Sequence, residues 1–368
     1  MSFGIFVDVF AVLYAFELLF LSYAAYLARR TPRERKDSVA FPKVSVVVAA
    51  KDEEKALPAC IDSITRIDYP CEMLEVLIVD DQSSDSTPKI IDQHAARFPF
   101  VKRIDAVKSL QLRGKANALA QGIERATGEF IFLTDADCTV PPSWIKDTLN
   151  YFDEDTGIVP GVTLISTAAK PIHGLQALDW DFLLTVGAGL ATIGKPVACL
   201  GNNLVFRKAA YDDVGGYREI KFSVTEDYAL FKSIVESRKW KFVYPMDSRT
   251  LVKTIPLEHL KDVFAQRKRW ATGGKDTGVF GKLILAPGFV LHWLMLAAIF
   301  FQPLTFIVMF PLKFIIEAAF LIPTLRRYGK IAHLNFILYF EIYYLIYVAI
   351  LPFSVYFGKS VIWKGRKY

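Results

Sequence analysis

Cysteine and histidine are scarce in this chain of 368 residues, which has four of the first and five of the second. The cysteines are widely spaced and form no Cys-x-x-Cys pair; they are Cys60, Cys71, Cys138 and Cys199. This spacing favours reduced thiols over a zinc site or a disulfide framework. The histidines are equally scattered, which argues against a histidine-based metal site.

A basic surface for nucleic acid is also missing. The net charge is only +6, and no stripe of cations with interleaved aromatic residues runs along the chain. The basic residues gather instead at 29–36 and 364–367, beside apolar runs. Cations at these places are typical of the flanks of membrane helices. We therefore expect a membrane and no nucleic acid among the partners.

Long apolar runs are abundant, and hydrophobic residues make up 53% of the chain. Residues 3–28 form one such run, in which Asp8 and Glu17 are the only acids. A run of about 20 apolar residues is long enough to cross a bilayer. Cations follow this run and do not precede it, which favours a membrane helix over a cleaved signal peptide. The positive-inside tendency then predicts a cytosolic location from Arg29 onward.

Three more apolar stretches follow residue 282, at 283–302, 305–325 and 334–357. Pro303 marks a bend between the first two. The third stretch is long enough for one tilted helix or for a hairpin interrupted near Pro352, and these alternatives place the basic C-terminal residues on opposite sides. We predict a C-terminal membrane region at 283–368 with two to four spans.

Between these regions, β-branched runs alternate with segments of helical period. Buried strands are predicted at 44–50, 74–79 and 130–134, and helices at 53–64, 84–97 and 115–126. This alternation predicts βαβ units and an α/β fold with a mostly parallel sheet. The domain plan comprises a membrane helix (1–28), a basic cytosolic linker (29–40), a catalytic domain (41–256), an amphipathic interfacial segment (257–282) and the membrane region (283–368).

Acidic residues end two of the predicted strands. Asp135 and Asp137 are two positions apart, so both carboxylates can point to the same side and meet on Mg²⁺ or Mn²⁺. Such pairs also cap loops, and the spacing alone leaves that alternative open. Asp81 follows another strand, where it can bind a ligand while Ser84 or Asp85 caps the next helix. Ligands bind beyond the carboxyl ends of strands in such sheets, which locates the candidate site.

Two groups of cations complete the candidate residues. Lys115 precedes a predicted helix, where it either reaches a diphosphate or belongs to a solvated surface. The segment 257–272 is amphipathic and contains Gln266, Arg269 and Trp270. It either lies in the membrane interface or supplies a cationic clamp for a diphosphate.

Four short motifs follow one another along the chain: Val79-Asp-Asp81, Asp135-Ala-Asp137, Thr225-Glu-Asp227 and Gln266-x-x-Arg269-Trp270. Each is common alone, and their order and spacing carry the signal. Together they resemble the membrane-bound family 2 glycosyltransferases, which include ceramide glucosyltransferase and the hyaluronan, cellulose and poly-N-acetylglucosamine synthases. The resemblance covers residues 41–274. It implies a GT-A fold and an inverting, metal-dependent transfer of a hexose from a nucleotide-sugar.

The resemblance also implies roles for the donor-binding residues. Asp81 would contact the nucleotide base, with Glu53 nearby, and Lys115 would lie near the phosphates. Asp137, together with Asp135, would hold the metal ion and the donor diphosphate. The family's first motif has Asn-Glu where this chain has Asp52-Glu53, so the contact of Asp52 stays open.

The remaining implied roles concern the transfer itself. Asp227 would be the general base that takes the proton of the acceptor hydroxyl. Gln266, Arg269 and Trp270 would close over the diphosphate and the acceptor end. The segment 201–203 resembles the part of the family's acceptor pocket that precedes the catalytic acid.

The number of spans guides the choice of acceptor. A polysaccharide synthase must shelter a hydrophilic chain across the bilayer, which takes many helices, whereas this chain offers four or five. We therefore expect a membrane lipid as acceptor. We also expect a UDP-sugar as donor and a cytosolic catalytic domain at the plasma membrane of a bacterium. The segment 173–195 is expected to be an acceptor surface or an amphipathic core helix. The alternatives are a processive polysaccharide synthase, a non-catalytic nucleotide-sugar-binding protein and a transporter.

Overall fold

The computed structural model describes residues 3–28, 41–357, 362–363 and 366–367, which form two compact units. The helical unit joins the described residues within 1–28, 165–197 and 256–368, and the sheet unit joins those within 29–164 and 198–255. The basic linker predicted at 29–40 lies outside the described residues.

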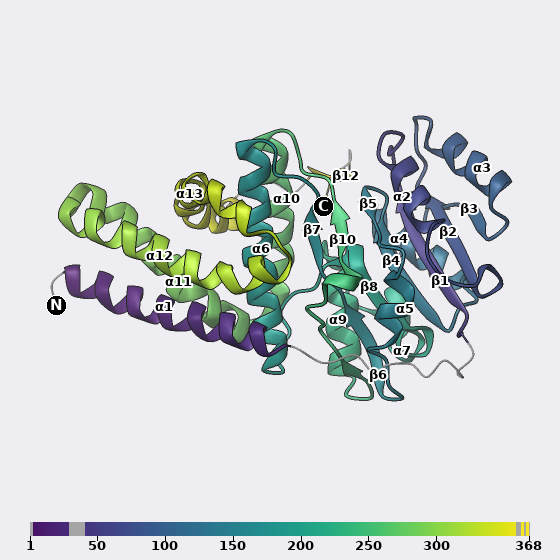
Figure 1. Cartoon of the computed structure of the whole chain (residues 1–368), viewed down its shortest axis with the longest axis horizontal. Coiled ribbons are helices and arrows are strands. Elements are labelled where there is room, and N and C mark those ends of the chain that lie inside the picture. Colours follow the sequence, from purple (N-terminus) through teal and green to yellow (C-terminus); the bar gives the residue numbers. More distant parts are fainter. Residues whose placement is uncertain (1–2, 29–40, 358–361, 364–365, 368) are drawn as a thin grey trace. The chain divides into compact units, whose positions relative to one another are not determined.

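The sheet unit is built on a sheet that has seven strands among the described residues, in the order β3-β2-β1-β4-β8-β6-β9 (Figure 1). The strands β1 to β4 run in parallel, and β8 pairs with β4 and β6 in antiparallel. Their bounds are β1 Val44–Ala50, β2 Leu74–Asp80, β3 Val101–Asp105, β4 Phe130–Asp135, β6 Thr156–Pro160, β8 Leu204–Arg207 and β9 Lys241–Phe242. A smaller sheet holds β5 Cys138–Thr139, β10 Val252–Thr254 and β7 Thr163–Ile165.

Helices cover both faces of the larger sheet, which explains its valine-rich strands. On β1, Val46 and Val48 pack into the core formed with α2, α3 and α5, whereas Val47 packs into the core formed with α4 and α9. A strand buried on both faces reads as a continuous apolar run rather than an alternating one. The helices of this unit are α2 Leu57–Ile64, α3 Thr87–Arg97, α4 Gly114–Arg125, α5 Trp144–Leu149, α7 Lys208–Asp213, α8 Gly216–Glu219 and α9 Glu226–Glu236, with short 3₁₀ turns η1 Cys71–Met73, η2 Gly201–Asn203 and η3 Ser248–Thr250.

The helix predicted from residue 53 begins only at Leu57, because the preceding residues bind another loop. The carboxylate of Asp52 accepts the N–H of Ser84 at 2.7 Å, and the hydroxyl of Thr87 accepts the N–H of Glu53 at 2.8 Å. The hydrogen bond from Ser84 lowers the pKa of Asp52. Asp52 therefore joins the loops after β1 and β2, and Asp85 accepts the N–H of Thr87 at the start of α3.

The helical unit contains the long apolar helices. Four segments among the described residues are long and apolar enough to span a membrane: Phe3–Leu27, Gly278–Phe301, Pro303–Arg327 and Ile331–Tyr356. The elements are α1 Phe3–Leu27, α6 Pro171–Thr192, α10 Leu260–Gly273, η4 Gly274–Thr277, α11 Gly278–Phe301, α12 Pro303–Arg327, η5 Ile331–Phe336 and α13 Ile337–Tyr356, followed by the short strands β11 Ile362–Trp363 and β12 Arg366–Lys367. Pro303 separates α11 from α12, and α13 continues through Pro352 as one helix rather than a hairpin.

The helix α6 groups with the membrane segments, although the sequence placed it within the domain at 41–256. It packs against α1, α12 and α13, and most of its residues are buried. A Cβ added at Gly189 would lie 2.5 Å from the carbonyl oxygen of Leu21, so α1 and α6 approach each other closely at this point. Of the two alternatives for residues 173–195, the structure shows the core helix.

Charged side chains are buried inside the same bundle. Lys313 Nζ lies 2.8 Å from Glu317 Oε1 and 2.5 Å from Glu341 Oε2, and the hydroxyl of Tyr14 donates to Glu317 at 2.6 Å. These residues join α1, α12 and α13, while apolar side chains of the same helices are exposed. Inward-facing, paired charges and outward-facing apolar side chains are typical of helix bundles in membranes.

Candidate active site

The predicted donor-binding acids meet at the carboxyl edge of the sheet. The register aligns Ala49 of β1 with Asp135 of β4 and Ala50 with Asp80 of β2, so the ends of three parallel strands lie side by side (Figure 1). From β1 the chain crosses to β2 on one side, and β4 lies on the other. This reversal of strand order is the place where open α/β sheets bind ligands. The buried Asp81 follows β2 at this edge, and Lys51 Nζ donates to its carbonyl at 3.2 Å.

Asp137 lies among other carboxylates. Burial, together with the neighbouring carboxylates of Asp135 and Glu53, raises the pKa of Asp137 to about 6. The thiol of Cys138 donates to Asp137 Oδ1 at 3.4 Å, and the thiol of Cys60 donates to the carbonyl of Asp135 at 3.4 Å. Burial raises the pKa of both cysteines, which therefore remain neutral donors.

These acids suit a divalent cation that also binds substrate phosphates. Among the described residues, no group of three or more His, Cys, Asp and Glu forms a ready metal cage. Mg²⁺ and Mn²⁺ need only one or two carboxylates when phosphate oxygens and waters complete the coordination shell. A cation at Asp135 and Asp137 would also relieve the repulsion that raises the pKa of Asp137. The residues present therefore fit the metal that the family resemblance implies.

Lys115 connects two of the predicted motifs. Its Nζ lies 2.5 Å from Asp135 Oδ1 and 3.4 Å from Glu226 Oε1. Burial alone would lower the pKa of Lys115, but the carboxylates of Asp135 and Glu226 outweigh it and raise that pKa. Lys115 is therefore part of a half-buried charge network and not a freely solvated surface residue. Glu226 was not predicted as a site residue. Its signal in the sequence is its place beside Asp227 in the motif Thr225-Glu-Asp227.

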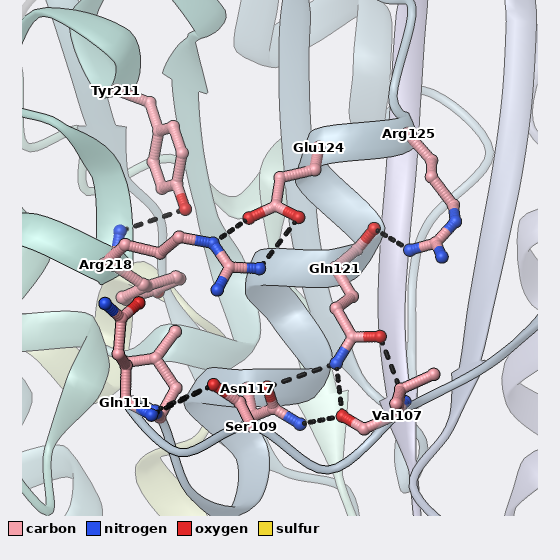
Figure 2. Close-up of polar contacts among 11 residues, drawn as sticks. Val107, Ser109, Gln111, Asn117, Gln121, Glu124, Arg125, Tyr211 and Arg218 are labelled. Carbon is pink, nitrogen blue, oxygen red and sulfur yellow. Dashed lines mark hydrogen bonds and ion pairs between the residues drawn. The ribbon is translucent and has the colours of Figure 1, made fainter.

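Side chains of α4 hold the loop that leads to Lys115 (Figure 2). Gln121 Oε1 accepts the N–H of Val107 at 3.0 Å, and its Nε2 donates to the carbonyl of Val107 at 2.7 Å. Asn117 Nδ2 donates to the same carbonyl at 2.9 Å. At its other end, α4 forms a two-point ion pair between Glu124 and Arg218, at 2.5 and 3.0 Å. Both ends of the helix that carries Lys115 are thus fixed.

Asp227 lies in the first turn of α9, where a backbone amide orients it. Its Oδ2 accepts the N–H of Gly201 at 2.8 Å, and its Oδ1 accepts the N–H of Tyr228 at 2.8 Å. A Cβ at Gly201 would lie 2.7 Å from Asp227 Oδ2, so only glycine permits this approach. Asp227 is half-buried, which leaves it accessible to a substrate hydroxyl.

Asn203 serves the frame of the site. Its Oδ1 accepts from the indole N–H of Trp144 at 3.0 Å, and its Nδ2 donates to the carbonyls of Val162 and Thr250 at 2.8 and 2.9 Å. The side chain is fully buried. Within the segment 201–203, the contact with the predicted base is therefore made by the backbone of Gly201.

Gln266, Arg269 and Trp270 lie on α10 in the helical unit, whereas the other predicted site residues lie in the sheet unit. All three are half-buried. Gln266 Oε1 accepts from Arg267 at 2.6 Å, and the ring of Trp270 meets that of Trp180 edge-on at 5.1 Å. The buried residues of α10 include an arginine, so this helix is not a simple apolar stripe on a surface.

Residues 45–215, which include the strands and acids of the carboxyl edge, match the sequence model of glycosyl transferase family 2. The chain carries a family 2 glycosyltransferase domain. Of the predicted site residues, this domain contains Glu53, Asp81, Lys115, Asp135 and Asp137, and Asp227 follows it in sequence.

Named relatives of this family 2 domain include lipid and polysaccharide enzymes. The chain is 29% identical to the β-monoglucosyldiacylglycerol synthase of Synechocystis sp. over 272 residues, 68% of this chain and 53% of that protein. It is 26% identical to the poly-β-1,6-N-acetyl-D-glucosamine synthase of Staphylococcus epidermidis over 326 residues, 85% of this chain and 73% of that protein. The chain thus spans about half the length of the first relative.

A solved structure supports the fold assignment over nearly the whole chain. The mannosyltransferase PcManGT of Pyrobaculum calidifontis, solved with GDP-Man and Mn²⁺, superposes with a TM-score of 0.65 at 19% identity. The match covers 97% of this chain and 100% of that chain. The predicted GT-A fold with flanking apolar helices is confirmed.

Proposed function

We propose that the protein transfers a sugar from a nucleotide-sugar to a membrane lipid, with inversion at the anomeric carbon. The observation that carries this proposal is the half-buried network at the sheet edge, in which Lys115 joins Asp135 to Glu226, next to Asp227 held by Gly201. The ion pairs of Lys115 connect Asp135, in the predicted donor-binding motif, to Glu226, which is next to the predicted base in sequence. Each motif alone occurs by chance in many proteins, but a direct contact between the two motifs is what a single transfer reaction would require.

On the donor side, Asp135 and Asp137 would hold Mg²⁺ or Mn²⁺ together with the diphosphate. Such a metal ion neutralises negative charge on the leaving nucleoside diphosphate. Lys115 keeps Asp135 in place and contributes a second positive charge near the phosphates. Asp81 and Glu53 are assigned to the nucleotide side, and a UDP-sugar is the proposed donor.

On the acceptor side, Asp227 would accept the proton of the attacking hydroxyl. The N–H of Gly201 and that of Tyr228 bind one oxygen each, which fixes the plane of the carboxylate. A base must come within about 3 Å of the proton that it takes. In-line attack opposite the leaving group converts an α-linked donor into a β-linked product. The assignment of Gln266, Arg269 and Trp270 to the diphosphate and the acceptor end remains a prediction from the resemblance.

The lipid acceptor rests on two observations. The helical unit contains four candidate spans, and one relative is a synthase of a glucosyldiacylglycerol. The positive-inside tendency of the basic residues at 29–36 supports a cytosolic site at a bacterial membrane. A processive polysaccharide synthase is the second candidate, favoured by the match over 73% of the poly-N-acetylglucosamine synthase.

The test uses membranes that contain the protein, a panel of radiolabelled nucleotide-sugars, and Mg²⁺ or Mn²⁺. The products are partitioned between an organic phase and a polymer precipitate, and Asp227→Asn serves as the inactive control. We expect label in the organic phase that is lost with a chelator and in the variant. Label in a high-mass, solvent-insoluble product would identify a polysaccharide synthase. Nucleotide-sugar binding without transfer would identify a non-catalytic binding protein.

A further inference from the structure

Arg267 lies between Gln266 and Arg269 on α10. It is more deeply buried than these two residues and than Trp270. Its side chain is 1% exposed, and its Nε donates to the carboxylate of Asp179, which is also 1% exposed. Asp179 belongs to α6, so the ion pair joins two helices of the helical unit. Burial alone would lower the pKa of Arg267, but the carboxylate of Asp179 outweighs it and raises that pKa.

The same guanidinium contacts two of the residues assigned to catalysis. Its Nη1 donates to Gln266 Oε1 at 2.6 Å. Its central carbon lies 4.2 Å from the centre of the Trp270 ring, a distance typical of a cation–π contact. Trp180, next to Asp179 in sequence, meets Trp270 edge-on at 5.1 Å. Arg267 thus contacts Gln266 and Trp270 at once, and Asp179 holds it in place.

A buried ion pair is a poor means of gaining stability. The desolvation of two charges consumes most of the attraction between them, and an apolar pair of similar volume often stabilises a protein as well or better. A guanidinium nevertheless offers something that an apolar side chain lacks, because its nitrogens point in fixed directions within one plane. One nitrogen can bind Asp179 while another binds Gln266, and the flat face remains free for Trp270.

We propose that Arg267, held by Asp179, is a positioning residue that fixes Gln266 and Trp270 for sugar transfer. The proposal rests on the transferase function argued above and adds to it a residue at a position that the motif leaves open. Arg267 acts through its neighbours and is not assigned to the substrate. The guanidinium also lies 5.8 Å from the centre of the Trp180 ring, so Arg267 contacts both of the tryptophan rings that meet edge-on.

The first test compares Asp179→Asn with Asp181→Asn in the full-length protein. Asp181 is the matched control, because it lies on the same helix, is equally buried and pairs with His333 Nδ1 at 3.0 Å. We expect Asp179→Asn to lower kcat about 100-fold, the size of effect that misplaced reacting groups produce, with little change in the donor KM. Asp181→Asn should retain a kcat near that of the wild type. Equal kcat values for the two variants would overturn the proposal.

Two further variants separate positioning from folding. Asp179→Leu combined with Arg267→Met replaces the ion pair by apolar side chains, so it should fold even if Asp179→Asn does not. We expect it to be stable but to show the same loss in kcat, and wild-type activity in this variant would refute the proposal. Arg267→Lys keeps the charge near Trp270 but has a single nitrogen, so its kcat should lie between those of the wild type and the double variant.

A second measurement does not depend on transfer. Each protein is compared with the same protein carrying Trp270→Phe, and the difference in tryptophan emission reports on Trp270 and its contact with Trp180. We expect this emission to shift to longer wavelength, and its quenching by acrylamide to increase, in Asp179→Asn and not in Asp181→Asn. An unchanged emission would contradict the positioning role even if no donor is found. Shifted emission in a protein that transfers no sugar would refute the proposed function while retaining the packing role of Arg267.

Discussion

The contact between Gly201 and Asp227 allows the predicted base to be moved without any change of charge. In Gly201→Ala, the new Cβ would lie 2.7 Å from both Cβ and Oδ2 of Asp227 and 3.0 Å from Cγ. Carbon atoms that are not bonded to each other pack at about 3.5–4.0 Å, so the side chain must move by about 1 Å. The φ angle of Gly201 lies outside the left-handed region, so alanine causes no backbone strain of its own.

The expected effect follows from this displacement. A shift of about 1 Å in a reacting group can reduce a rate about 100-fold, which corresponds to about 2.7 kcal/mol of activation free energy. The hydrogen bond from the N–H of Gly201 to Asp227, now 2.8 Å long, would be distorted at the same time. We therefore expect kcat of Gly201→Ala to be about 100-fold below that of the wild type, with binding of the donor largely retained.

The assay is initial-rate transfer of radiolabelled sugar in membranes at saturating donor. Gly274→Ala is the matched control, because among the described residues no heavy atom beyond its own helix lies within 4 Å of its added Cβ, and its φ is −58°. This control should transfer sugar at the wild-type rate. If Gly201→Ala also has the wild-type kcat while Asp227→Asn is inactive, the reasoning from the geometry of Asp227 is refuted.

Three further predictions concern other charged residues. Lys115→Met leaves Asp135 and Glu226 without the cation between them, so we expect the transfer rate to fall at least about 100-fold. An equal loss in Lys115→Arg, which keeps the charge, would contradict an electrostatic role. Burial alone would raise the pKa of Glu75, but hydrogen bonds from Ser45 and Thr127 lower it. The stabilisation of the folded state by the ionised Glu75 carboxylate is therefore present at neutral pH, and it is lost as the pH falls through the lowered pKa. Glu75→Gln should cost about 2 kcal/mol in the free energy of unfolding at pH 7 and less below about pH 4; a difference independent of pH would be evidence against this effect. Lys313→Met leaves Glu317 and Glu341 buried without their cation, and we expect it to cost about 3–5 kcal/mol in thermal unfolding in detergent, largely recovered by a second change, Glu341→Gln; a stable single variant would show that the cluster adds no net stability.

The sheet and its acidic edge were predictable because their signals are local. The β-branched runs of β1 and β2 and the acids after β2 and β4 are read within a few residues. The start of α2 was misplaced by four residues because Asp52 and Glu53 bind the loop after β2 instead of continuing a helix. That competition involves partners more than thirty residues away, which no local pattern reveals.

The contacts that complete the site were not predictable for the same reason. Lys115 finds Glu226, and Asp227 finds Gly201, only after the sheet brings distant segments together. The place of α6 within the helical unit was hidden by its polar residues, which read as those of a partly solvated helix. Their partners lie far along the chain: Asp179 pairs with Arg267, and Asp181 with His333.

The tie between α1 and α12 has a consequence for how the chain is made. Tyr14 and Glu317 are separated by 303 residues, so at a synthesis rate of about 5–20 residues per second the first helix waits for roughly 15–60 s before its partner emerges. The strands of the sheet unit, between Val44 and Thr254, are all synthesised within that interval. During it, α6 can pack against α1 and, once residue 273 has been made, against α10, whereas α12 and α13 come later. The strands of the sheet unit are therefore synthesised before the helices that close the bundle around α1.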